Sequence, residues 1–280
     1  FKGLFVGSDY VRQHLSGMDR TVDLNAPSVF DRTGSGQIRA VATANATRPI
    51  LPVNGGVRNV NVIMNLGIAD YDGLQTLISY RGSQRFYTTF SYTLSKATNT
   101  SEPDGNGIGP NQNIITRLGE QERGLSSVDQ THRAVLTFIY HFPLGFSAGT
   151  VSQFASARPF NATTGVDNNG DGATNDRPVI NAAFAKSSYR GTGTQDVAIF
   201  VENRIRLGES RAILLRLEGF NIFNHGNFLA RGVTVYGNGD LPNSDFGSFV
   251  GGVGTSTTAI PAFANIDPPR MFQVQARFIF

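Results

Sequence analysis

One stretch of the chain has the residue types and spacing of a cation-binding loop. Residues 167–178 read Asp-Asn-Asn-Gly-Asp-Gly-Ala-Thr-Asn-Asp-Arg-Pro, with oxygen ligands and a glycine placed as in the first half of an EF-hand calcium loop. Pro178 stands where that loop has its bidentate glutamate, so Asp176 would have to substitute. The predicted ligands of a weak Ca²⁺ site are Asp167, Asn169, Asp171 and Asp176. The alternative is a polar turn that uses Asn, Asp and Gly for their backbone freedom.

Patterns that would indicate catalysis are weaker. The histidines show neither metal spacing nor an HExxH arrangement. The segment Gly145-Phe-Ser-Ala-Gly149 matches the hydrolase pattern G-x-S-x-G, but that elbow needs a strand before the serine and a helix after it. Here a turn precedes Ser147 and a strand is expected to follow. We predict no enzymatic activity, no catalytic residue, and no cofactor apart from the possible Ca²⁺. The four histidines are His14, His132, His141 and His225.

Composition limits the class of protein. The chain has 280 residues, no cysteine, 16% charged residues, 32 glycines and 21 phenylalanines. No apolar run approaches the roughly 18 residues of a transmembrane helix, so a membrane role would fall to strands. A net charge of +3 is small for this length, and we expect no binding of nucleic acid.

In the last ten residues, 271–280, every second residue from Phe272 to Phe280 is apolar. Three of the four intervening residues are polar, which gives a period of two over a whole strand. About 9–11 residues also suffice for a tilted strand to cross a bilayer. We predict that this segment closes an outer-membrane β-barrel and acts as its membrane-insertion signal. The apolar residues of that signal are Phe272, Val274, Ala276, Phe278 and Phe280.

Three hairpins with the same alternation precede this strand. Their tight turns fall at 82–83, 143–145 and 208–209, whereas the connections at about 100–130, 159–195 and 224–270 are long and polar. Compact soluble domains rarely carry several such loops, but membrane barrels have short periplasmic turns and long outer loops. A further strand is expected at 1–8 and another within 57–66, and the rest of 9–69 is mixed. The predicted hairpin strands are 70–82 with 84–99, 131–142 with 146–158, and 196–207 with 210–223.

The predicted fold is therefore all-β, an antiparallel transmembrane β-barrel represented by about eight strong strands. Seven charged residues fall on the less apolar face of these strands, and a Lys or Arg facing lipid at the midplane would cost about 2–4 kcal/mol. The strands of a soluble sandwich with one wet face also alternate between apolar and polar residues. A sandwich does not, however, explain the difference between short and long connections. The charged residues in question are Arg133, Glu202, Arg204, Arg206, Arg216, Glu218 and Arg277.

Several segments together resemble a known family. They are Tyr71-Asp-Gly-Leu-Gln75 followed by Phe90-Ser-Tyr-Thr-Leu-Ser-Lys-Ala97, the acidic stretch 167–178, Arg216-Leu-Glu-Gly-Phe-Asn-Ile-Phe-Asn-His-Gly-Asn-Phe228, and the terminal phenylalanine. In order and spacing they are similar to the C-terminal barrel of TonB-dependent outer-membrane receptors of the Oar-like type. The resemblance covers most of the chain from about residue 57.

That resemblance implies a 22-stranded barrel with an N-terminal plug and a TonB-contacting box. Residues 1–280 contain neither in recognisable form, so we expect them to be the C-terminal part of a barrel domain. The implied partners are outer-membrane lipid, the barrel-assembly machinery, TonB acting through the missing part, and an unidentified imported siderophore, glycan or peptide. Two alternatives remain open: a non-transporting structural or adhesive barrel, and a soluble calcium-binding β protein.

Overall fold

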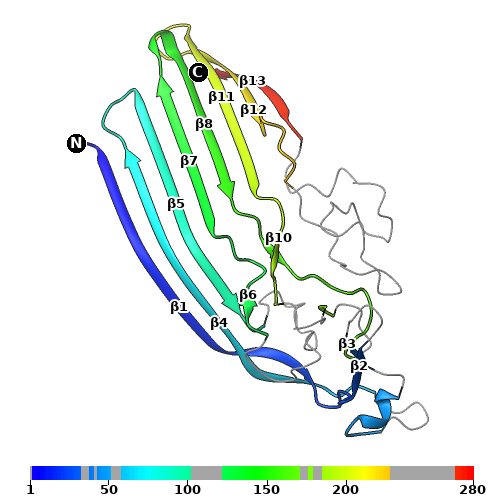
Figure 1. The fold of residues 1–280 in the computed structure, drawn as a ribbon. Helices are drawn as coiled ribbons and strands as arrows, with labels where there is room; N and C mark the ends of the chain where they lie inside the picture. Colours follow the sequence, from blue (N-terminus) through cyan, green and yellow to red (C-terminus); the bar gives the residue numbers. More distant parts are fainter. Residues whose placement is uncertain are drawn as a thin grey trace.

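The chain forms one long, curved antiparallel sheet in which strands adjacent in sequence are adjacent in space (Figure 1). This computed structural model describes residues 2–32, 38–40, 43–51, 58–101, 122–170, 176–178, 185–227 and 269–280. The main strands, in order, are β1 (Leu4–Asp23), β4 (Asn61–Tyr80), β5 (Phe86–Asn99), β7 (His132–His141), β8 (Phe146–Ala155), β11 (Thr194–Arg206), β12 (Ala212–Phe220) and β13 (Met271–Ile279). The predicted all-β antiparallel fold is confirmed, although the sheet does not close, because β1 and β13 form its two edges.

Short elements lie at one end of the sheet of eight main strands, which we call the wall. β6 (Gly124–Leu125) extends the sheet by pairing with the end of β5. Two small separate ladders lie beyond the wall, one formed by β2 (Phe30–Arg32) with β3 (Ile38–Ala40), the other by β9 (Pro159–Phe160) with β10 (Tyr189–Arg190). The 3₁₀ turn η1 (Ala44–Thr47) lies in the first long connection and η3 (Pro143–Gly145) in a short one.

The predicted alternation of short turns and long connections is confirmed. The three hairpins are joined at 81–85, 142–145 and 207–211, all at the end where β1 begins and β13 finishes (Figure 1). At the second of these turns Leu144 and Gly145 have φ values of 61° and 79°, the left-handed conformation that a tight reversal requires. The long connections emerge at the opposite end, called the loop end below.

The N-terminal quarter differs from the prediction. Residues 9–23 continue β1, and the expected strands at 57–66 and 70–82 are one strand, β4. From residue 57 onward there are therefore seven main strands, and β1 makes the eighth. The pairing of β1 with β4 shifts register on both sides of Met18, next to Gly17 at φ 75°. Such a β-bulge displaces the alternation by a residue, which concealed the continuous strand.

Register assigns each side chain to one of two faces. One row, on the face called outward below, runs Phe138–Thr150–Ile199. A row on the other face, called inward, runs Glu202–Arg216–Gln275. The charged residues expected on the less apolar face lie there together. Only a few apolar side chains in the described part of the chain are fully buried, so no second sheet covers the first. This arrangement is that of a barrel wall and not of a sandwich.

Candidate functional site: the two faces and the loop end of the wall

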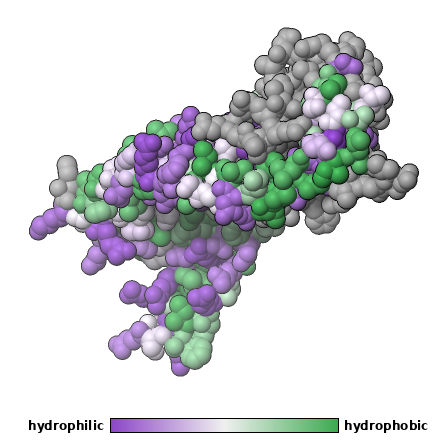
Figure 2. Space-filling view, turned by 90° about the horizontal axis from the view of Figure 1, so that it is seen from below, coloured by the Kyte–Doolittle hydropathy of each residue, from purple (hydrophilic) through white to green (hydrophobic). Residues whose placement is uncertain are grey.

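The outward face carries an apolar band along all eight main strands. In β13 the apolar set predicted as an insertion signal lies on this face, opposite Ile213, Leu215 and Leu217 of β12. Phe272 and Val274 are 67% and 79% exposed, and hydrophobic residues gather in a zone beside hydrophilic ones along the sheet (Figure 2). Nine residues at about 3.3 Å each, tilted by about 40°, span about 23 Å, close to the apolar height of an outer-membrane barrel.

Ionic side chains mark where this band stops at the loop end. The outward row Tyr10–Leu74–Leu94–His132 is the last mainly apolar one, and the next row contains Arg12, Asp72 and Lys96. Tyr10 donates its hydroxyl to Asp72 at 2.6 Å. One row further, Asp70 contacts His14 at 2.7 Å and pairs with Arg123. The sequence reasoning missed this group, whose only sequence signal is the alternation within 4–15.

The inward face is polar and internally paired. Arg216 donates to Glu218 at 2.7 Å and to Glu202 at 3.2 Å, and its guanidinium carbon lies 4.0 Å from the centroid of the Phe200 ring. All three charged side chains remain partly exposed. Charges paired in this way are stable beside water but costly beside lipid, so this face lines an aqueous lumen.

The same inward row places Ser147, the serine of the hydrolase-like pattern, next to a histidine. Ser147 lies opposite His141 across the β7–β8 hairpin, with its hydroxyl 2.8 Å from Nδ1 of the imidazole. A nucleophile needs a base that is oriented by a further acid and an oxyanion hole nearby. Glu202 lies on the far side of Ser147 and pairs with Arg216, and the Ser147 backbone lies within a ladder. The pair is a cross-strand contact.

Buried polar residues fasten the long connections to one another. Arg48 of the first connection is 3% exposed and lies 3.6 Å from Asp23. It donates to the carbonyl oxygens of Asn25 and Arg58 at 2.7 Å and 2.9 Å, and it also donates to the carbonyl of Gly170. Burial lowers the pKa of this guanidinium, and the nearby Asp23 partly opposes that shift.

A second buried pair ties the connection after β5 to the one after β8. Arg177 donates to Glu122, and both side chains are almost wholly enclosed. Burial raises the pKa of the Glu122 carboxyl, outweighing the attraction of Arg177; burial likewise lowers the pKa of Arg177. Lys186 donates to Asn99, and Arg190 pairs with Asp129. We call the described parts of 24–60, 122–131 and 156–193 the loop platform.

The predicted calcium ligands lie within this platform. Asp176 is fully buried, and its Oδ2 accepts the backbone N–H groups of Asn168 and Asn169 at 2.6 Å and 2.9 Å. Asp167 faces Arg58 at 3.2 Å, while Asp171 lies outside the described residues. Both described carboxylates thus act as fasteners of the loop, and among the described residues there is no metal-binding group of three His, Cys, Asp or Glu. The calcium site stays a prediction.

The described part of the chain contains no helix long and apolar enough to span a membrane. The wall instead combines an outward apolar band, an inward ionic face and a fastened loop platform. The family model described as "Outer membrane beta barrel domain" matches residues 1–189. No curated protein and no solved structure matches the chain. With more than half of its length matched, and with this wall, the chain belongs to the outer membrane β-barrel domain family and resides in the outer membrane.

Proposed function

We propose that the chain forms part of the barrel of a TonB-dependent receptor of the Oar-like type, which captures a ligand at its outer loops and imports it. The observation that carries this proposal is the pair of open edges, β1 and β13. An unpaired strand edge in hydrocarbon costs several kcal/mol per backbone group. Further strands that pair with both edges would give a wide, water-filled barrel, as the resemblance to these receptors implies.

In this proposal the chain binds and passes a siderophore, glycan or peptide and does not transform it. Energy comes from TonB through a plug in the rest of the receptor. The barrel-assembly machinery recognises the apolar, aromatic-ended face of β13, and lipid covers the outward band. Residues such as Arg216 and Glu202 line the water-filled lumen. Nucleic acid is not among the proposed partners.

The loop platform favours a second candidate function. Its buried contacts, Arg48 with the Gly170 carbonyl and Arg177 with Glu122, hold three connections in one arrangement. A fixed outer surface also suits a barrel that presents its loops for adhesion and transports nothing. The two functions differ in whether TonB is needed.

The experiment uses the full-length protein in its own outer membrane. Detergent-extracted protein is tested for co-purification with the periplasmic domain of TonB, and cells with and without TonB are compared for accumulation of labelled siderophores, oligosaccharides and peptides. A TonB complex together with TonB-dependent accumulation of one ligand class is the expected result. A protein that assembles normally but shows neither would exclude import and favour the adhesive barrel.

A further inference from the structure

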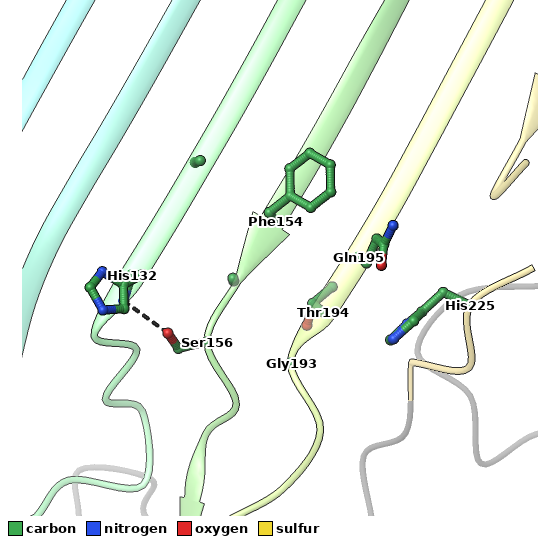
Figure 3. A pocket seen from close by; sticks show the side chains of 9 residues that line it. His132, Phe154, Ser156, Gly193, Thr194, Gln195 and His225 are labelled. Atoms are coloured by element: carbon green, nitrogen blue, oxygen red, sulfur yellow. Dashed lines mark hydrogen bonds between the residues drawn. The ribbon is translucent and has the colours of Figure 1, made fainter. Parts of the chain in front are cut away.

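A hollow on the outward face lies where the apolar band meets the loop end (Figure 3). Its volume is about 360 Å³, and it lies among the loop-end parts of β7, β8 and β11 and the segment that follows β12. Register places Ala134, Phe154 and Gln195 in one outward row across these three strands. The lining residues are His132, Ala134, Phe154, Ala155, Ser156, Gly193, Thr194, Gln195 and His225.

The depth of this hollow matches the outer headgroup region of the membrane. His132 lies eight residues along β7 from Tyr140, which is about 27 Å of strand and about 20 Å across the membrane at a tilt of about 40°. Ala134 and Phe154 lie on the lipid side of the hollow, within the apolar band. His132 belongs to the last mainly apolar row, beyond which Lys96 and Arg12 begin the ionic border.

The segment after β12 holds His225 at this place. Its backbone N–H donates to Oδ1 of Asn221 at 2.9 Å, and its carbonyl accepts from the Asn221 amide at 3.0 Å. Asn227 bonds both the N–H and the carbonyl of Gln195, at 2.9 Å and 3.1 Å. The asparagines of the sequence Asn221-Ile-Phe-Asn-His-Gly-Asn227 therefore fix the His225 backbone against β11.

Hydrogen bonds also indicate which ring nitrogen carries the proton in His132 and in His225. Oδ1 of Asn227 is an acceptor, so His225 donates to it through Nδ1 at 2.9 Å and keeps Nε2 for a ligand. His132 has its Nδ1 2.7 Å from the Tyr92 hydroxyl. If Tyr92 donates, the neutral ring of His132 carries its proton on Nε2 and can donate there. Figure 3 shows His225 directed toward Thr194 and Gln195 from across the hollow.

None of the described residues that line the hollow is acidic. In the polar part, Nε2 of His132, the Gln195 amide and the hydroxyls of Ser156 and Thr194 can donate to phosphate or sugar oxygens. Nε2 of His225, whose ring proton is on Nδ1, can accept a hydrogen bond from a sugar hydroxyl. The apolar part continues into lipid. A metal ion is a poor occupant, because the described residues there supply only two imidazoles and no carboxylate.

We propose that this hollow binds the phosphorylated sugar headgroup of an outer-leaflet glycolipid, with one acyl chain lying along Phe154 and Ala134. The occupant is an amphiphile because one part of the lining is polar and lies at headgroup depth, whereas the other part is apolar and lies at hydrocarbon depth. The site would anchor one lipid beside the loop platform and fix the height of the wall in the membrane. This inference does not depend on transport or on TonB.

The test measures lipid retention by the full-length protein in detergent, by native mass spectrometry. The probes are a bisphosphorylated glucosamine-disaccharide lipid and its dephosphorylated form. The test variant combines His132→Phe with His225→Phe, which keeps an aromatic ring at each position and removes the polar nitrogens. The matched control, His14→Phe, changes an outward histidine near the same border but outside the hollow. Wild type and control should retain the phosphorylated lipid. Retention by the double variant should be lower by at least about five-fold.

Undiminished retention by the double variant, or equal retention of the dephosphorylated lipid, would overturn the proposal. Equally strong binding of free glucosamine phosphate would also overturn it, because the ligand would then be water-soluble. If the double variant does not assemble, seen as loss of the heat-modifiable band on a gel, Gln195→Leu takes its place. The Asn227 contacts use only the Gln195 backbone, so this variant keeps the fold. A smaller loss of lipid is expected, and no loss contradicts the site.

Discussion

The outward and inward faces of the same strands differ most in where they carry charge. At the depth of Leu136 and Phe138 the outward face of the described strands has no ionic side chain, and toward the loop end ionic residues begin at Arg12 and Asp72. The inward face carries Glu202, Arg216 and their neighbours along its length. The two faces share backbone, strand length and twist. Their difference therefore reports only the surrounding medium, lipid on one side and water on the other.

The largest effect should come from placing a charge on the outward face at mid-depth. Leu136→Arg is expected to destabilise the assembled barrel by about 2–4 kcal/mol, because the guanidinium would face hydrocarbon. Val135→Arg, one residue earlier in β7, points into the lumen beside Ser91 and Gln153 and should cost far less. Urea titration of the full-length protein in lipid vesicles, followed by the heat-modifiable gel band, compares the two. Equal costs would mean that the faces are wrongly assigned.

The outward face also tests the insertion signal. Removing Phe280, which stacks on Phe278 with ring centroids 6.0 Å apart, should slow outer-membrane assembly several-fold, since the end of the apolar series is lost. The amount of folded protein in the outer membrane after a pulse of synthesis measures this. Deletion of a single loop residue, such as Ser188, is the control and should assemble at nearly the normal rate. Normal assembly without Phe280 would contradict its role as part of a signal.

Removing a charge from the inward face should destabilise the barrel less than adding a charge to the outward face. Arg216→Ala leaves Glu202 and Glu218 without their shared partner and is expected to cost about 1 kcal/mol, because all three side chains are partly hydrated. Glu202→Gln combined with Arg216→Gln should recover part of the loss. The same urea titration measures both, and a loss as large as that of Leu136→Arg would refute a wet lumen.

The smallest effect is a pH dependence at the loop platform, beyond both faces. Burial raises the pKa of Glu122 above its ordinary value of 4.5, so the folded chain holds this proton more tightly than the unfolded chain does. The contribution of this carboxyl to stability is full below about pH 4.5 and is lost as pH rises through the raised pKa. Hydrogen exchange at Thr164 and Asn168, corrected for intrinsic rate, should therefore show protection falling with pH. In Glu122→Gln that slope should vanish; an unchanged slope would assign it to another group.

Sequence could predict the fold where local pattern decides it. The hairpins, their turns and the two faces follow from period-two alternation, and register confirms them. The continuous β1 was hidden because the bulge at Met18 breaks the alternation.

The platform could not be predicted, because contacts such as Arg48 with Gly170 join residues far apart in the chain. The outward ionic border was missed for a different reason: a sequence does not mark where the lipid ends. The hollow around His225 required knowing which strands lie beside the segment after β12.

The ladder between β1 and β4 has a mechanical consequence. Eighteen residue pairs join these strands from Leu4–Tyr80 to Asp23–Asn61, and antiparallel hydrogen bonds lie perpendicular to the strands. The connection between them leaves both strands at the loop end, so a pull on it along the strand axis moves β1 and β4 as one unit. The load passes to the twelve residue pairs between β4 and β5, whose bonds are loaded sideways and all together. Traction at the cell surface would thus enter the wall through two strands that move together.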